Sequence, residues 1–373
     1  MKHCSFFIAA TGQHIGKTTT CLGLVSGLKK RVGSVGFFKP VGQEYVELEK
    51  DYHVDKDVLL FDEHLNLHSD LRLMSPILLP RGFTRDFLDQ KITTKEIEAK
   101  IIHAFLALKK MHHNIIVEGT GHIGVGSIVG CNNAKVAKDL NLPIVIVASG
   151  GLGSAFDALA INKALCDQQG VKIAGVILNR VIEDKKEMIL HYMKKALQTW
   201  DIPLLGCIPY APFLSNPSMK DFELLFKAPI LSGQNHYMRH FKQTKFVAST
   251  LENFKNIILP GQLIITASNR EDIILDTLAR QLEAKENSTD ADLGLGMILT
   301  GKLAPREDIV DQLRKADIPM IHAPLSSYKA MELITSYTVK IGREDKEKVD
   351  LATKLAEENI DFDLLLSQIS RST

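Results

Sequence analysis

A short glycine-containing segment near the N-terminus has the residue types and spacing of a phosphate-binding loop. It reads Thr-Gly-Gln-His-Ile-Gly-Lys-Thr-Thr over residues 11–19, between an apolar run and a segment with helical spacing. Small residues let backbone N–H groups surround phosphate oxygens, and the N-terminus of the following helix adds unpaired donors and partial positive charge. The segment therefore predicts binding of nucleotide phosphates, and an ordinary strand–turn–helix corner is the alternative.

Individual residues of this loop have separate predicted roles. Lys17 would neutralise the β- and γ-phosphates of ATP, and the Thr18 hydroxyl would ligate Mg²⁺. Thr11 stands where the strict pattern G-x-x-x-x-G-K-[ST] has its first glycine. The nucleotide contacts are assigned to the whole loop, that is to Thr11, Gly12, His14, Ile15, Gly16, Lys17, Thr18 and Thr19.

An acidic residue, Glu118, ends an apolar run at residues 114–117. An apolar strand that ends in a carboxylate is the usual magnesium partner of a phosphate loop. The glycine-rich stretch that follows, residues 119–127, formally contains G-x-G-x-x-G, but the loop is too long to open a helix directly as a dinucleotide fingerprint does. A flexible loop without ligand contacts is the alternative, and His14 and His122 are read as loop residues rather than as acids or bases.

Three further polar residues lie where strands end or helices begin. Lys39 follows a strand predicted at residues 35–38, and the carboxyl edge of a parallel sheet faces the ligand crevice. Asp57 is either a second magnesium carboxylate or a charge at a helix start. Asn179 ends a strand, where its amide could contact adenine or close a turn.

The order of elements predicts an α/β fold with a mostly parallel sheet covered by helices on both faces, because short strands that are apolar on both sides alternate with helices. Strands are expected at residues 5–10, 35–38, 114–117, 144–148, 173–178 and 204–208, and helices at 17–30, 93–111, 154–166 and 184–199. Thr93 or Thr94 is expected to cap the helix that follows, with Glu96 close behind.

Prolines at residues 209–217 interrupt this pattern, so a domain junction is placed there, between domains 1–218 and 219–373. The second domain is predicted to be a smaller α/β unit with C-terminal helices. Its strands are expected at 247–249, 263–267 and 296–299, its helices at 271–284, 306–315 and 344–369, and a polar loop at 285–292.

Composition narrows the classes of function. The chain of 373 residues has 45 Lys and Arg against 44 Asp and Glu, which argues against broad binding to nucleic acid or anionic membrane. The apolar N-terminal run is short for a signal peptide, so a cytoplasmic protein is expected. The five cysteines form no C-x-x-C pair, which makes a disulfide framework or structural zinc site improbable.

The first domain resembles the dethiobiotin-synthetase-like P-loop family. The shared pieces are Thr-Gly-x-x-x-Gly-Lys-Thr at 11–18, Phe38-Lys39-Pro40-Val41, Asp57, Glu118-Gly119-Thr120-Gly121 and Asn179. Residues 118–127 and 205–209 are similar to the N-terminal domain of some phosphotransacetylases. Residues 219–373 resemble the DRTGG domain that follows it there, through 259–261, 269–273, 299–301 and 318–319. The acyltransferase domain of those proteins is expected to be absent.

The resemblance implies site roles and cofactors. Lys17 and Lys39 would stabilise a carbamate and the transferring phosphate, while Asn179 would contact adenine. Mg²⁺ would be held by Thr18, Asp57 and Glu118.

Two functions remain open. One is an ATPase or ATP-dependent ligase that activates a small carboxylate or carbamate by phosphoryl transfer. The other is a nucleotide-sensing regulatory module with little or no turnover. The C-terminal domain is expected to be regulatory, the substrate is an unidentified small molecule, and a homodimer is a further implication of the resemblance.

Overall fold

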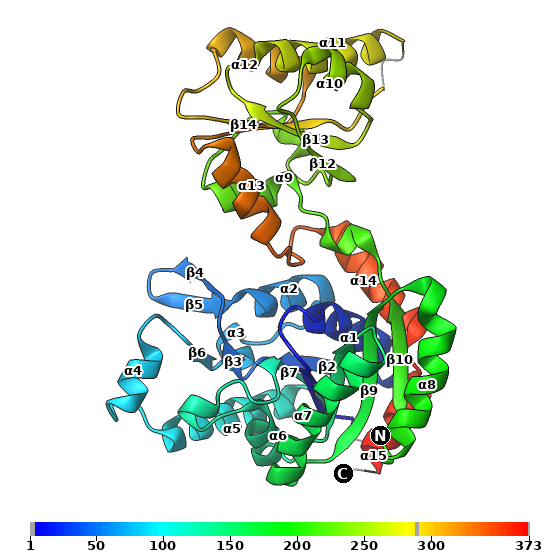
Figure 1. Cartoon of the computed structure of the whole chain (residues 1–373). Helices are drawn as coiled ribbons and strands as arrows, with labels where there is room; N and C mark the ends of the chain where they lie inside the picture. Colours follow the sequence, from blue (N-terminus) through cyan, green and yellow to red (C-terminus); the bar gives the residue numbers. More distant parts are fainter. Residues whose placement is uncertain (1–3, 288–290, 372–373) are drawn as a thin grey trace. The chain divides into compact units, whose positions relative to one another are not determined.

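The computed structural model describes residues 4–287 and 291–371 (Figure 1). The chain divides into two compact units. The first unit comprises residues up to Ala211 together with those from Ile341 onward, and the second unit comprises residues from Pro212 to Lys340. The second unit is therefore inserted in the sequence of the first.

A sheet of six parallel strands forms the centre of the first unit. Its strands are buried on both faces, as the continuous apolar runs of the sequence require. In spatial order they are β10 (Leu204–Pro209), β9 (Ile173–Val181), β8 (Ile144–Ser149), β1 (Phe6–Ala10), β7 (Asn114–His122) and β2 (Val35–Phe38).

Helices pack on this sheet, and the predicted fold class is confirmed. The capping box at the start of α5 is present as well, since the Thr93 and Glu96 side chains each accept a backbone N–H of the other residue. The helices of the first unit are α1 (Lys17–Val32), α2 (Lys56–Leu65), α3 (Leu71–Met74), α4 (Phe83–Leu88), α5 (Thr94–Met111), α6 (Asn133–Asp139), α7 (Gly153–Gln169), α8 (Lys186–Gln198), α14 (Lys346–Asn359) and α15 (Phe362–Ser370).

Two small sheets between β2 and α5 complete the first unit. One pairs β3 (Val41–Gly42) with β6 (Ile77–Leu78), and the other is an antiparallel hairpin of β4 (Tyr45–Glu49) and β5 (Tyr52–Asp55). The hairpin leads directly into α2, so it places the start of that helix beside the end of the central sheet.

The second unit is a smaller α/β fold with its own core. Four of its five strands are parallel, and only β11 runs antiparallel to its neighbour. The strands in order are β11 (Ile230–Ser232), β15 (Met320–Ala323), β14 (Gly296–Thr300), β13 (Gln262–Ala267) and β12 (Gln243–Phe246). Its helices are α9 (Met219–Phe226), α10 (Leu251–Ile257), α11 (Glu271–Asn287), α12 (Glu307–Ala316) and α13 (Ser327–Ser336).

The C-terminal helices differ from the prediction, because they belong to the first unit and not to the second. The predicted helix over 344–369 is two helices, α14 and α15. The break falls at Ile360, which bridges Gly206 on the edge strand β10, and the Asp361 N–H donates to Leu205 O at 2.8 Å. This pairing with the sheet edge interrupts the helix.

Two smaller elements of the second unit also differ from the prediction. The strand predicted at 247–249 lies at Gln243–Phe246, a largely exposed edge strand whose polar residues hide the strand pattern. The polar loop predicted at 285–292 begins later, because α11 continues to Asn287. Residues 288–290 of that loop lie outside the described part.

Two further findings concern the cysteines and the lengths of the helices. All five cysteines are free and buried. Within residues 4–287 and 291–371, no helix combines the length and apolar character needed to cross a membrane.

Candidate functional site

The predicted phosphate loop connects β1 to α1 in the central sheet. Gly16 caps α1 with φ of 89°, and a Cβ at this position would lie 2.2 Å from Asn179 Nδ2. Only glycine adopts this positive φ readily and also leaves room for the Asn179 side chain. No side chain caps this end of α1, so its first-turn N–H groups remain available to an anion.

Lys17, in the first turn of α1, reaches across to the glycine-rich loop after β7. Its Nζ donates to the Gly121 carbonyl at 3.2 Å. Burial lowers the pKa of Lys17, and the positive charge of Lys39 lowers it further, while Glu118 opposes both effects. A partly desolvated ammonium with one neutral partner is well suited to bind phosphate oxygens.

Thr18 and Glu118 form a direct contact between α1 and the neighbouring strand β7. The Thr18 hydroxyl donates to Glu118 Oε1 at 2.9 Å. Glu118 is 1% exposed, and its second oxygen, Oε2, has no hydrogen-bond partner among the described residues. Burial raises the pKa of Glu118, although Lys39 and Lys17 oppose the rise. This orphaned buried oxygen can accept a hydrogen bond from a water or coordinate a cation.

Lys39 lies among three carboxylates at the end of β2. Its Nζ forms an ion pair with Asp57, and lies 3.4 Å from Asp55 Oδ1 and 3.9 Å from Glu118 Oε1. Burial alone would lower the pKa of Lys39, but Asp57, Glu118 and Asp55 reverse this and raise it above the ordinary value. The ammonium is therefore charged, and it occupies the position of a cation in this cluster.

Asp55 is a member of the site that the sequence reasoning missed. It is 1% exposed and ends β5, where its Oδ1 accepts the Asp57 N–H at 2.9 Å as the N-cap of α2. Its Oδ2 has no hydrogen-bond partner among the described residues. Burial raises the pKa of Asp55 to about 6, although Lys39 opposes the rise. The signal available in the sequence was a second acid two residues before Asp57.

The raised pKa of Asp55 predicts an unusual pH dependence. Between the ordinary value of 3.8 and about 6, the folded protein binds more protons at this residue than the unfolded chain does, so the contribution of Asp55 to stability falls as pH rises. In Asp55→Asn the cap is retained and the charge is absent. We expect the free energy of unfolding of the variant, relative to wild type, to increase from pH 4 to pH 6, by at most about 1.4 kcal/mol per pH unit.

Urea denaturation of both proteins at pH 4, 5, 6 and 7 measures this difference. A difference that stays constant or decreases over this range would contradict the assignment.

Asn179, at the end of β9, contacts the phosphate loop itself. Its Nδ2 donates to the Ile15 carbonyl at 2.9 Å, and its Oδ1 accepts the Arg180 N–H at 2.9 Å. In this arrangement the amide holds the backbone of the loop in place. The adenine contact predicted for Asn179 stays a prediction.

The glycine-rich loop after β7 is anchored in the structure. Gly119 lies so close to Phe7 that a Cβ would be 2.5 Å from its ring, and the Thr120 hydroxyl donates to Val41 O at 2.6 Å. Asn133 donates to the carbonyl groups of Thr120 and His122 at 2.8 and 2.7 Å. These contacts hold the loop in the position where its Gly121 carbonyl accepts the hydrogen bond from Lys17.

The predicted magnesium ligands share one neighbourhood. Asp57 and Glu118 both lie beside the Lys39 ammonium, and Thr18 bonds to Glu118. Among the described residues no group of three or more His, Cys, Asp or Glu side chains has the arrangement of a metal site. The donors still fit Mg²⁺, which prefers a few oxygen ligands and keeps several waters, and the orphaned Oε2 of Glu118 offers one of them.

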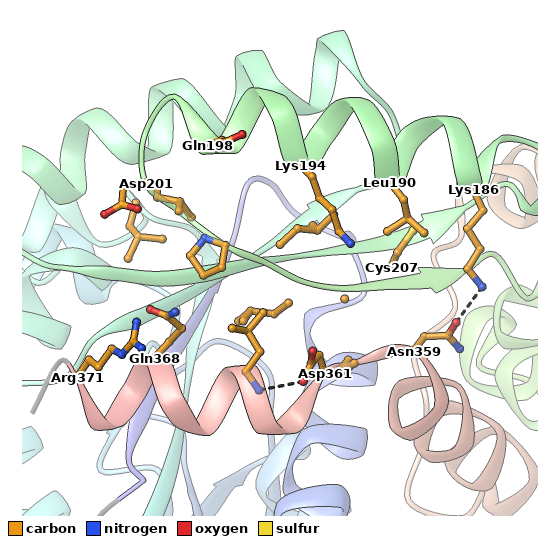
Figure 2. Close-up of a pocket in the computed structure, with 18 of the residues that line it drawn as sticks. Lys186, Leu190, Lys194, Gln198, Asp201, Cys207, Asn359, Asp361, Gln368 and Arg371 are labelled. Atoms are coloured by element: carbon orange, nitrogen blue, oxygen red, sulfur yellow. Dashed lines mark hydrogen bonds between the residues drawn. The ribbon is translucent and has the colours of Figure 1, made fainter.

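A separate hollow lies elsewhere in the first unit, and none of the predicted site residues lines it. It is a groove of about 1000 Å³ along the edge strand β10, between α8 and α15. In Figure 2 Lys194 and Leu190 point into it from α8, while Gln368 lies opposite on α15 and Arg371 lies just after that helix. Its size alone assigns no chemistry to it.

Comparisons with known proteins cover both units. The AAA domain family (AAA_26) matches residues 5–218, and the DRTGG domain matches residues 225–337. The phosphate acetyltransferase of Nitratidesulfovibrio vulgaris is 24% identical over 381 residues, which cover 98% of this chain and 51% of that protein. The chain thus spans about half the length of the phosphate acetyltransferases it matches.

A second relative aligns with the first domain over nearly the whole length of the relative. The ATP-dependent dethiobiotin synthetase BioD of Methanocaldococcus jannaschii is 32% identical over 228 residues, which cover 59% of this chain and 97% of that protein. The solved MinD cell division protein of Aquifex aeolicus covers 57% of this chain and 84% of its own at 16% identity, with a TM-score of 0.36, too remote for further conclusions. The chain belongs to the dethiobiotin-synthetase-like AAA domain family and carries a DRTGG domain in addition.

Proposed function

We propose that this protein binds Mg-ATP at the loop between β1 and α1 and uses it to activate a small carboxylate or carbamate by phosphoryl transfer. One observation carries the proposal: the Lys39 ammonium lies among Asp55, Asp57 and Glu118, directly beside the Thr18–Glu118 hydrogen bond. Two lysines, a hydroxyl and buried carboxylates at the mouth of a phosphate loop match the needs of phosphoryl transfer, which are positioning and charge neutralisation.

In the proposed complex the loop binds the phosphates through its backbone N–H groups. Lys17 would exchange its contact with the Gly121 carbonyl for β- and γ-phosphate oxygens. Mg²⁺ bound by Thr18, Asp57 and Glu118 would neutralise charge on the phosphates. Lys39 would then exchange its pairing with Asp57 for an oxygen of the acceptor or of the γ-phosphate.

The transfer step follows from this placement. An oxygen of the carboxylate or carbamate forms a bond to the γ-phosphorus, while the bond from that phosphorus to the bridging oxygen of ADP breaks. The electron pair leaves on ADP, and the product is a mixed anhydride of the acceptor with phosphate. Lys17 and Lys39 stabilise the charge on the transferring group, and the acceptor needs no proton removed because it is already an anion.

The second candidate is a nucleotide sensor with little turnover, and the DRTGG unit favours it. The phosphate acetyltransferases align with both domains of this chain, although their activity differs from that of the synthetase. Because the two domains occur together in proteins of different activity, we assign them a shared regulatory role. The cytoplasmic location and the homodimer belong to both candidates as expectations.

Phosphate release separates the two candidates. We expect wild type with Mg-ATP to release phosphate faster in the presence of one member of a panel of small carboxylates, or of diamines with bicarbonate. Lys39→Met should lose most of this stimulated release while it still binds nucleotide. Nucleotide binding without stimulated release across the panel would favour the sensor, and absence of nucleotide binding would contradict both.

A further inference from the structure

The chain that returns from the second unit packs against the two helices whose first turns carry the candidate site. We call residues 341–362 the return segment; it includes α14 and the start of α15. In Figure 1 the orange-red α14 lies beside the blue α1. The first turn of α1 carries Lys17 and Thr18, and the first turn of α2 carries Asp57, so the segment contacts both helices that support the site.

Its packing against α1 leaves no room between the helices. A Cβ on Gly23 would lie 2.0 Å from the Cβ of Ala356, and a Cβ on Gly27 would lie 2.3 Å from the ring of Phe362. Glycines on one helix face let the partner helix approach at backbone distance, and such close-packed contacts transmit displacements because they cannot be compressed.

Polar contacts fix the register of the two helices. Glu357 accepts hydrogen bonds from the Ser26 hydroxyl at 3.0 Å and from Lys30 Nζ at 2.7 Å. The Arg31 guanidinium lies 4.2 Å from the centre of the Phe362 ring. A slide of α14 along α1 would break both hydrogen bonds of Glu357, and the Arg31–Phe362 contact holds α15 to the same helix.

The same segment also contacts α2 at its C-terminal end. The Arg343 carbonyl lies 2.5 Å from His64 Nε2, and Arg343 Nε lies 3.9 Å from Glu63 Oε2. The Lys29 ammonium on α1 in turn donates to the Leu65 carbonyl of α2 at 2.6 Å. The return segment and the C-terminal halves of α1 and α2 thus form one connected support.

We propose that the return segment positions the first turns of α1 and α2 for nucleotide binding and couples the second unit to the nucleotide site. Gly23 is six residues from Lys17, about 9 Å along a stiff helix, so a shift at Ala356 displaces Lys17 and Thr18. Helix α13 of the second unit ends at Ser336 and α14 begins at Lys346, so residues 337–345, which form no helix or strand, join the second unit to α14. The inference rests on the proposed binding of Mg-ATP.

Two matched pairs of variants in the full chain test the positioning role. Ala356→Leu inserts three carbon atoms against Gly23, and Lys354→Leu introduces the same side chain at an exposed position of the same helix. Glu357→Gln removes the charge that bonds to Ser26 and Lys30, and Glu358→Gln removes the neighbouring charge, whose described ion pair stays within α14. Urea denaturation first identifies the variants that remain folded.

Calorimetric titration with Mg-ATP should show affinity reduced at least about fivefold in Ala356→Leu and about twofold to threefold in Glu357→Gln, within the range of known coupling between sites. Both control variants should bind as wild type does. If Ala356→Leu fails to fold, Glu357→Gln decides this part, because it keeps the shape of the side chain. Wild-type affinity in every folded variant would overturn the positioning role.

Amide hydrogen exchange of the wild type tests the coupling. Mg-ATP should slow exchange at least about threefold in α14 and in α13, the last helix of the second unit, because binding that orders α1 orders what is packed and joined to it. Binding with exchange unchanged in both helices would overturn the coupling alone. Failure of the wild type to bind any nucleotide would overturn the proposed function and this inference with it.

Discussion

Replacing Lys39 by methionine is expected to destabilise the nucleotide-free protein by about 3–5 kcal/mol at pH 8, because the substitution removes the ammonium that lies between the buried carboxylates of Asp55 and Glu118. The Lys39 side chain is only 10% exposed, and Asp55 and Glu118 are 1% exposed. Water therefore has little access to solvate the two carboxylates once the ammonium is removed. The loss should be smaller at pH 5, where Asp55, whose pKa is raised to about 6, accepts a proton.

Mg²⁺ without nucleotide should restore part of this stability. In wild type the ammonium occupies the cation position, so millimolar Mg²⁺ is expected to change the melting temperature little. In Lys39→Met no ammonium competes with Mg²⁺ for these carboxylates, and the melting temperature should rise with Mg²⁺ concentration.

Lys135→Met is the matched control, because Lys135 also pairs with two carboxylates, those of Glu98 and Asp139, outside the site. An equal response to Mg²⁺ in both variants, or no loss of stability in Lys39→Met, would contradict the assignment of this cluster.

Replacing Lys17 by alanine should weaken Mg-ATP binding about 100-fold, which corresponds to about 3 kcal/mol for charge-assisted hydrogen bonds to phosphate. The substitution should not lower the free energy of unfolding. Burial lowers the pKa of Lys17, so the ammonium costs free energy where it stands, and its one described hydrogen bond is to the Gly121 carbonyl. The variant should therefore unfold at the same urea concentration as wild type or at a higher one.

Lys163→Ala provides the control for this prediction. Lys163 lies on α7, pairs with Asp167 at 2.5 Å and is not part of the site. We expect it to bind Mg-ATP as wild type does. If Lys17→Ala binds as tightly as the control, the nucleotide does not use the loop; if Lys17→Ala is unfolded, Lys17 has a structural role that the contacts do not show.

The central sheet and its phosphate loop could be predicted from the sequence because their signals are local. Continuous apolar runs at residues 5–10 and 144–148 are typical of strands buried on both faces, and both are strands of the central sheet. Thr93 and Glu96 form a cap that is visible in four consecutive residues. The glycine and lysine of the loop follow the first strand directly, and the structure places them at the start of α1.

The features that the sequence could not predict depend on contacts between distant residues. Amphipathic spacing at 344–369 indicates helices but does not say which core they cover, and the deciding contact of Ala356 with Gly23 joins residues more than 300 positions apart. Asp55 resembles any acid at a helix start until the fold brings Lys39 beside it. Asn179 offers a donor and an acceptor to many partners, and only the structure shows the Ile15 carbonyl as one.

Calorimetric titration of the wild-type chain with ATP, in the presence and absence of Mg²⁺, tests the central claim most directly. The account predicts one binding site per chain, with tighter binding when Mg²⁺ is present, because Thr18, Asp57 and Glu118 offer it oxygen ligands beside the phosphates. It also predicts that saturating Mg-ATP raises stability, by about 2.7 kcal/mol at 100 times the dissociation constant. No binding of ATP or of any other nucleoside triphosphate would contradict the account.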